Sequence, residues 1–430
     1  MVRCERFGKI HLPGGRMNVL TIIWLALGSV ITLLWLRRHV DISRAQRSGF
    51  ILTPDGDGSP GSGVAPRISV IVAARDEASN IECCVRSLLS QDYPSLELIV
   101  VNDRSVDGTA SILERCGRDA GGRMRVHHVT EVRAGWFGKT NALQTGLSDA
   151  RGEFFLFTDA DCEFQSTGAV SIAMAYASDH GIEFLTVTPE TSVGGFWPAA
   201  ILPVCTGILM IWHPPEKVND PKHRAAYANG AFMLIRRDAY ERVGGHAAVR
   251  DAICEDMQLA RRAKSMGVRL GMVRSQGLYG TRMYDTPGEA WRGWTRIMQG
   301  SLRTPGRVAA AIVLLSVSSL LPWAALIAGV AAWSRSSGNG WWWPAWIIVW
   351  GSACGVQQWA TIRAYPMMGA RRAMALTYVL GAAASLGILV NAFLKVMGIG
   401  VTIWRGRSYR GARVAEVAVS VAKEPVRVGG

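Results

Sequence analysis

Short apolar runs alternate with amphipathic stretches through the middle of the chain. The apolar runs occupy residues 68–73, 96–101, 125–130 and 153–158, and stretches with helical spacing lie at residues 79–90, 107–116 and 140–148. Such an alternation predicts a mostly parallel α/β sheet with helices on both faces. Ligands of these sheets bind beyond the carboxyl ends of the strands, so we expect the chemistry to lie there.

Long uncharged apolar stretches flank this central part. Residues 17–36 form an apolar run that ends at Arg37 and Arg38. The run is longer than a signal-peptide core and no small-residue cleavage site follows it, so we expect a transmembrane anchor. Residues 308–404 contain two further stretches of spanning length, at 308–333 and 341–362.

The last apolar stretch, residues 373–404, is too long for one simple span and contains Asn391 and Lys395. We therefore expect its end to lie along the membrane interface or to re-enter, which leaves two or three spans in residues 308–404. Residues 196–212 are apolar but marginal in length, with aromatic residues at the ends, and we expect an interfacial helix. The remaining segments are a Gly-, Ser- and Pro-rich linker at 41–66, a globular domain at 67–303 and a basic tail at 405–430.

The formal net charge of +14 comes largely from arginines beside the apolar stretches. This distribution is typical of the positive-inside bias and argues against a nucleic-acid partner. We expect an integral membrane protein of the bacterial inner membrane with its globular domain in the cytoplasm. The chain has 8 cysteines but no C-x-x-C pair, which favours reduced thiols over a zinc site.

Acidic side chains follow three of the expected strands. Asp76 and Glu77 follow the first, Asp103 follows the second, and Asp159-Ala160-Asp161 follows the fourth. Two carboxylates separated by one small residue suit Mn²⁺ or Mg²⁺ bound together with substrate phosphate oxygens, although a lone pair of this kind is more often an acidic turn. Asp103 is suited to accept a hydrogen bond from a nucleobase or ribose. Lys139 opens a helix, where backbone N–H groups favour a diphosphate.

Six motifs occur in an order that resembles family-2 glycosyltransferases of the GT-A fold. The resemblance is to the membrane-bound, lipid-glycosylating branch, which includes ceramide glucosyltransferase-like and carotenoid glycosyltransferase-like enzymes. It extends from about residue 68 to residue 300. The motifs are VIVAARDEASNI, LELIVVNDRSVDGT, GKTNAL, ARGEFFLFTDADC, NGAFMLIRRDAYERVGGH and AICEDMQLARRAKSMG.

The resemblance implies a role for each motif. Asp76 or Glu77 and Asp103 would hold the nucleoside of a UDP- or GDP-sugar, and Lys139 would lie near its diphosphate. Asp161 would be the main metal ligand, and Asp159 would contact both the metal and the nucleotide-sugar. Asp256 would be the general base, with Asn229, Gly230 and Glu255 on the acceptor side. Independently of the family, the position of Asp256 at a helix start predicts that the helix dipole keeps it ionised.

Two departures from the family pattern affect these roles. Asp76 stands where the family has an amide. The processive members carry a Gln-x-x-Arg-Trp element near the membrane, whereas residues 291–296 here keep similar residue types in another order. This difference favours transfer of a single sugar. Arg292 and Arg296 are four residues apart and share a helix face, where they are candidates for contacts with the diphosphate or with lipid headgroups.

The sequence thus predicts an inverting, metal-dependent transfer of one sugar from a nucleotide-sugar to a hydrophobic acceptor. Within enzymes, the alternative is a polysaccharide or polyprenol-phosphate sugar synthase. A non-catalytic membrane component that only binds nucleotide is the alternative from another class. Residues 308–362 contain one charged residue, Arg335, and it lies in the presumed outer link between the two spans, which argues against a transport pathway.

Overall fold

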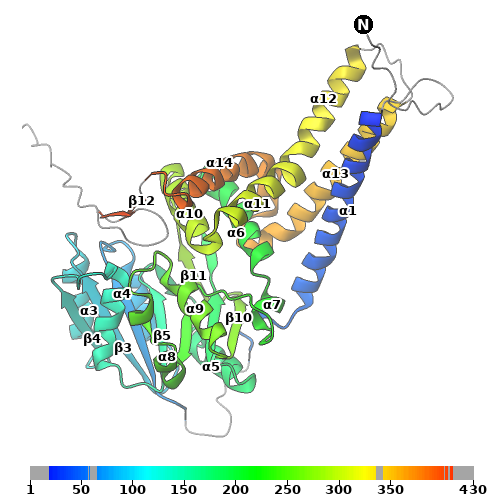
Figure 1. The fold of residues 1–430 in the computed structure, drawn as a ribbon. Helices are drawn as coiled ribbons and strands as arrows, with labels where there is room; N and C mark the ends of the chain where they lie inside the picture. Colours follow the sequence, from blue (N-terminus) through cyan, green and yellow to red (C-terminus); the bar gives the residue numbers. More distant parts are fainter. Residues whose placement is uncertain are drawn as a thin grey trace, which may run out of the picture.

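The computed structural model describes residues 19–56, 58, 65–335, 342–400, 402–404 and 407–409. An α/β domain forms one end of the molecule, and an elongated group of helices extends from it (Figure 1). A further set of helices lies between these two parts. The N-terminal helix begins at the far end of the elongated part and runs towards the β-sheet.

An eight-stranded sheet forms the centre of the α/β domain, and it confirms the predicted fold class. Its strand order is β1-β10-β7-β9-β5-β2-β3-β4, and all described pairs are parallel except those of β9. The four strands expected from the sequence are β2, β3, β4 and β5. The bounds are β1 Ile51–Leu52, β2 Ile68–Ala74, β3 Leu96–Asp103, β4 Met124–Val129, β5 Phe154–Asp159, β7 Phe184–Thr188, β9 Met233–Arg236 and β10 Leu270–Ser275.

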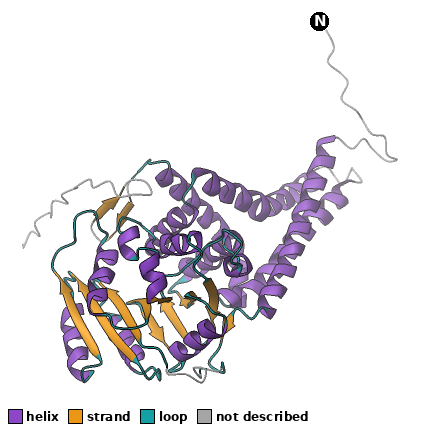
Figure 2. Ribbon diagram, turned by 60° about the horizontal axis from the view of Figure 1, so that its bottom comes forward, coloured by secondary structure: helices purple, strands orange, loops and turns teal. Residues whose placement is uncertain are grey.

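Helices cover both faces of this sheet (Figure 2). Side chains alternate along a strand, so Val70 and Val72 of β2 enter one hydrophobic cluster whereas Ile71 enters the other. The continuous apolar runs in the sequence follow from this burial on both faces. The domain helices are α2 Ile81–Leu89, α3 Thr109–Asp119, α4 Gly138–Gly146, α5 Ala169–Asp179, α7 Pro215–Asn219, α8 Arg237–Arg242 and α9 Glu255–Ser265.

A small second sheet was not expected from the sequence. It joins β6 Cys162–Phe164, β11 Tyr279–Arg282 and β8 Glu190–Ser192. Because β6 follows Asp161 directly, this sheet holds the chain beyond the Asp159-Ala160-Asp161 motif. A two-stranded hairpin, β12 Thr402–Trp404 and β13 Arg407–Tyr409, lies near the C-terminus.

The elongated part consists of three helices, α1 Val19–Arg47, α12 Leu321–Arg335 and α13 Trp342–Ala364. α11 Pro305–Leu315 leads into α12 through a π-helical turn at Ser316–Leu320. α6 Phe196–Trp212, α10 Pro287–Leu302, α11 and α14 Tyr378–Val396 form a separate hydrophobic cluster beside the α/β domain. In Figure 1, α14 lies across the direction of α1 rather than along it.

α1 is longer than the expected anchor. It continues to Arg47, so residues 41–47 of the predicted linker are helical, and β1 lies within the rest of that segment. The described residues contain four helices that are long and apolar enough to cross a membrane, and these indicate membrane association. They are Val19–Arg47, Phe196–Asn219, Pro305–Arg335 and Arg372–Val396.

These four helices differ in how far the protein itself covers them. Only 11% of the α1 window is buried, compared with 56% for the segment that contains α6. α6 is thus packed mainly against protein, whereas α1 exposes most of its apolar surface. α13 packs along α1 but is not among the four helices.

Candidate functional site

The carboxyl ends of three neighbouring strands form one edge of the site. Asp159 is the last residue of β5, Asp103 is the last residue of β3, and Glu77 follows β2, which lies between them. All three residues line a single cavity, together with Asp161 and Asp256. The structure therefore brings together most of the residues that the sequence singled out, although they come from distant parts of the chain.

Lys139 at the start of α4 is the cation at the centre of this site. Its Nζ lies 2.5 Å from Asp159 Oδ1 and 2.7 Å from Glu255 Oε1. Burial by itself lowers the pKa of Lys139, but the attraction of Asp159 and Glu255 outweighs burial and raises the pKa well above its ordinary value. Lys139 therefore stays charged and links the end of β5 to the start of α9.

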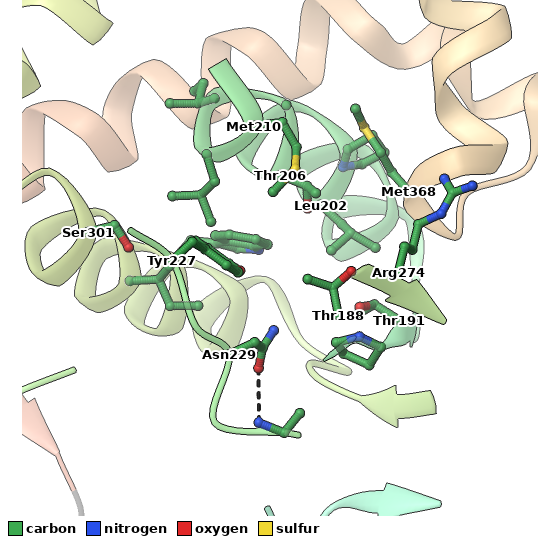
Figure 3. A pocket seen from close by; sticks show the side chains of 18 of the residues that line it. Thr188, Thr191, Leu202, Thr206, Met210, Tyr227, Asn229, Arg274, Ser301 and Met368 are labelled. Carbon is green, nitrogen blue, oxygen red and sulfur yellow. Dashed lines mark hydrogen bonds between the residues drawn. The ribbon is translucent and has the colours of Figure 1, made fainter. Parts of the chain in front are cut away.

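Gly230 lies where these groups converge. A Cβ at this position would be 2.9 Å from Lys139 Nζ, 3.4 Å from Asp159 Oδ2 and 3.6 Å from Asp256 Oδ2. A side chain would thus crowd the Lys139 ammonium and the carboxylates beside it. The neighbouring Asn229 accepts the Ala231 N–H through its side-chain oxygen at 3.0 Å, which fixes the turn around Gly230 (Figure 3).

Asp161 lies beside Asp159 in a strongly electronegative environment. Burial, together with repulsion from Asp159 and Glu77, raises the pKa of Asp161 to about 7. A divalent cation would relieve this repulsion, and carboxylate oxygens are the ligands that Mn²⁺ and Mg²⁺ take. No cluster of three or more His, Cys, Asp or Glu side chains with metal-binding geometry occurs among the described residues. The carboxylates of Asp159 and Asp161 are suited to such a cation by their chemistry alone.

Asp256 occupies the first turn of α9. Its Oδ2 accepts the Gly230 N–H at 3.0 Å and its Oδ1 accepts the Met257 N–H at 2.7 Å. Burial and repulsion from Glu255 raise the pKa of Asp256 to about 7, even though Lys139 opposes this shift. The helix dipole was expected to keep Asp256 ionised, but burial acts in the opposite direction and is the largest cause of the raised pKa.

Arg104 is a site residue that the sequence reasoning missed. Its Nε lies 2.8 Å from Asp103 Oδ1 and its Nη2 lies 3.1 Å from Oδ2, and it lines the cavity. Arg104 has a φ of 56°, which is costly for a residue with a side chain. Gly138 leaves room for the pair, because a Cβ there would lie 2.5 Å from Asp103 Oδ2. The charge beside Asp103 was visible in the sequence, but the backbone conformation was not.

Two predicted site residues lie away from the cavity lining. Asp76 is exposed and has a φ of 53°, and its side chain accepts the Val106 N–H at 2.8 Å, so it supports the loop after β2. Arg292 is also exposed and does not line the cavity, whereas Arg296, one turn later on α10, does. Although the two arginines share a face of α10, only Arg296 lines the cavity.

The cavity extends far beyond the cluster of carboxylates. Its volume is about 1100 Å³, and it continues past Tyr227 to α6 and then to α1. Figure 3 shows Leu202, Thr206 and Met210 of α6 on one side of this space, with Thr188, Arg274 and Met368 also around it. A mainly apolar passage therefore connects the carboxylates with the helices that indicate membrane association.

Comparison with known proteins places the chain in a family. Residues 66–292 match the model described as "Glycosyltransferase like family 2", and residues 218–386 match "Glycosyl transferase family group 2". The 4,4'-diaponeurosporenoate glycosyltransferase of Staphylococcus aureus is 26% identical over 262 residues, which cover 59% of this chain and 68% of the relative.

Solved structures of glycosyltransferases are similar at lower identity. The mannosyltransferase PcManGT from Pyrobaculum calidifontis, in complex with GDP-Man and Mn²⁺, is 22% identical with a TM-score of 0.48, covering 79% of this chain and 97% of that one. TarS 1–349 of Staphylococcus aureus, in complex with UDP-GlcNAc, is 15% identical with a TM-score of 0.38, covering 82% and 98%. The family match over residues 66–292 is the decisive finding: the chain belongs to glycosyltransferase family 2.

Proposed function

We propose that the protein transfers a single sugar from a nucleotide-diphosphate sugar to an apolar acceptor, with inversion at the sugar carbon. The observation that carries this proposal is the continuity of the cavity from Asp159, Asp161 and Asp256 to the apolar helices α6 and α1. A donor can occupy the polar end while a lipid-like acceptor reaches the same carboxylates from the other end. The Staphylococcus aureus relative is named for a carotenoid acid, and this name supports an apolar acceptor.

The donor end is suited to a UDP- or GDP-sugar. Asp103, held by Arg104, and Glu77 would contact the nucleoside, and the diphosphate would lie near the N-terminus of α4 and Lys139. Asp161 and Asp159 would hold Mn²⁺ or Mg²⁺. When bound, the cation supplies positive charge that offsets the charge developing on the departing diphosphate.

Asp256 is the proposed general base. The acceptor hydroxyl gives its proton to Asp256 while its oxygen bonds to the sugar carbon, and the bond from that carbon to the diphosphate breaks. A pKa of about 7 lets this carboxyl accept a proton at neutral pH without being too weak a base. Glu255, Asn229 and Gly230 would border the acceptor hydroxyl, because they surround Asp256.

We further propose that α1, α11–α12 and α13 cross the membrane and that α6 and α14 lie at its interface. The α/β domain, approximately residues 67–303, would then be cytoplasmic. Two observations support this arrangement: α1 exposes its apolar surface, and α6 is mostly covered by protein. The α14 helix runs across the direction of α1, as an interfacial helix would (Figure 1).

Two measurements test the function. The full chain in membranes should release UDP or GDP from a nucleotide-sugar only in the presence of Mn²⁺ or Mg²⁺. Mass spectrometry of lipids from cells with and without the protein should show a new hexosylated apolar lipid. Sugar found on a polymer or a polyprenyl phosphate would instead favour the synthase alternative. Absence of release with every donor and either metal would favour a non-catalytic role.

A further inference from the structure

Part of the cavity is lined by the apolar helices rather than by the α/β domain. We call this part the membrane chamber and define it by Trp35, Arg38, Leu315, Ser319, Thr361 and Tyr378, all of which line the cavity. These residues come from α1, α11, the π-helical turn, α13 and α14. The chamber is thus enclosed by helices that are far apart in the sequence.

Most polar side chains of the chamber have partners within the protein. Trp35 Nε1 donates to the Ser318 carbonyl at 2.8 Å, and the hydroxyls of Tyr378 and Ser319 are 2.8 Å apart. Thr361 Oγ1 donates to the Gln358 carbonyl at 2.9 Å. These groups have little capacity left to bind a ligand by hydrogen bonds.

Arg38 is the exception. Its side chain is half-buried and lines the chamber, but it makes no hydrogen bond or ion pair with any residue that the structure describes. Asp41, one turn further along α1, also lines the cavity and attracts the Arg38 charge from beyond ion-pair distance, while its ion pair, at 3.9 Å, is with Arg44. A guanidinium has five N–H donors and cannot lose its charge, so one that lines a cavity and donates to no described residue indicates a ligand.

Arg363 of α13 provides an internal comparison. It also lies between α13 and α1, but its guanidinium contacts His39, the Ser43 hydroxyl at 3.0 Å and Gln46 Oε1 at 2.9 Å. The helix pair can therefore satisfy an arginine completely when that arginine holds the helices together. Arg38 is turned instead towards the cavity, which argues for a role in binding rather than in packing.

The helix opposite Arg38 has an irregular backbone. α11 and α12 are joined by the π-helical turn Ser316–Leu320, and Ser318 and Ser319 of this turn line the chamber. Turns of this kind are frequent at functional sites, because they widen a helix locally. Arg38 and the π-helical turn thus line the same cavity.

We propose that the membrane chamber binds an oxyanion carried by an apolar chain, a carboxylate or a phosphate, and that Arg38 is its ligand. This inference rests on the proposed function in one respect: the chain that occupies the chamber is the acceptor. The acceptor then carries an anionic group in addition to the group that receives the sugar. The catalytic end of the cavity would bind the group that receives the sugar, and the membrane chamber would bind the anionic group of the same molecule.

Binding of simple amphiphiles tests the site without requiring turnover. Dodecyl phosphate and dodecanol are titrated into the full-length protein in a neutral detergent, with calorimetry as the readout. We expect dodecyl phosphate to bind about tenfold more tightly than dodecanol, as a charge-assisted hydrogen bond would produce. Arg38→Gln should remove this preference and Arg38→Lys should retain part of it. Arg47→Gln on the same helix, outside the cavity lining, should leave it unchanged.

The outcomes separate this inference from the proposed function. If Arg38→Gln prefers dodecyl phosphate over dodecanol as strongly as the unaltered protein does, the proposed site is wrong. The site is also wrong if Arg47→Gln loses this preference as fully as Arg38→Gln does. If sugar transfer occurs but the hexosylated lipid has no second, anionic group, the assignment of the chamber to the acceptor is wrong while the function stands. If Arg38-dependent binding occurs without any sugar transfer, the site stands and the proposed function fails. Thermal unfolding of each variant shows whether it is folded.

Discussion

At the catalytic end of the cavity, Lys139, Asp256 and Asp103 all have partners within the protein. Lys139 contacts two carboxylates, Asp256 accepts two backbone N–H groups, and Asp103 is held by Arg104. At the membrane end, Arg38 lines the cavity without a hydrogen bond or ion pair to any residue that the structure describes. We infer from this difference that the catalytic end is organised before ligands arrive and that a ligand supplies the partner of Arg38 at the membrane end.

Replacing Asp256 should lower sugar transfer more than any other change below, and the effect should be confined to the catalytic step. Asp256→Asn keeps the shape and the hydrogen bond from Gly230 but cannot take a proton, so we expect transfer to fall by about 10²- to 10⁴-fold. Nucleotide binding, measured by calorimetry, should stay nearly unchanged. Asp119→Asn at the exposed end of α3 is the matched control. Full activity in Asp256→Asn would exclude it as the base.

Filling the apolar passage should lower sugar transfer without weakening nucleotide binding. Thr206 of α6 lines the passage, so Thr206→Trp should block the acceptor and lower transfer by about a hundredfold through steric exclusion. Nucleotide binding should be retained, and Thr206→Val should behave like the unaltered protein. If Thr206→Trp weakens nucleotide binding as much as transfer, the two ends are not independent.

Gly230→Ala should disturb the paired charges without changing any charge. The new Cβ would lie 2.9 Å from Lys139 Nζ, so the ammonium would have to shift relative to its carboxylates. We expect kcat to fall by about ten- to a hundredfold, because small displacements at a reacting centre are costly. Gly355→Ala on α13, where a Cβ meets nothing within 4 Å, is the control. A normal kcat in Gly230→Ala would show that the cluster tolerates displacement.

The pH profile should report the pKa of Asp256. Its pKa is raised to about 7, so the carboxyl is protonated and inactive below this pH and ionised above it. We expect kcat to rise about tenfold per pH unit below pH 7 and to level off above it. Arg38-dependent binding of dodecyl phosphate should not follow this curve. A kcat that is constant between pH 5 and pH 7 would contradict the assignment.

Arg104→Lys should give the smallest effect. Lysine keeps the charge but loses the two-pronged contact with Asp103, and we expect the KM for the nucleotide-sugar to rise about three- to fivefold. Arg104→Ala should raise KM further, because it leaves the buried Asp103 without its partner. An unchanged KM in Arg104→Ala would show that the pair has no part in donor binding.

The sequence was sufficient for the sheet because its signals are local. The apolar runs at residues 68–73 and 96–101 predicted β2 and β3 almost to the residue, and the fold class followed from their alternation with helices. The antiparallel strand β9 and the second sheet were not predicted, since pairing between distant segments leaves no periodic signal. Asp76 and Arg292 could not be separated from Glu77 and Arg296 for a similar reason, because spacing along the chain does not fix which side chain faces a cavity.

The sequence by itself determined the family, the α/β class, the apolar helices and which residue types are available for catalysis. These depend on motif order, hydropathy and composition, which are properties of short segments. Only the tertiary structure decided that Lys139 lies between Asp159 and Glu255, that burial raises the pKa of Asp256, and that one cavity joins these groups to Arg38. Distances between segments, burial and cavity shape arise when the chain packs, because they depend on which distant residues come into contact.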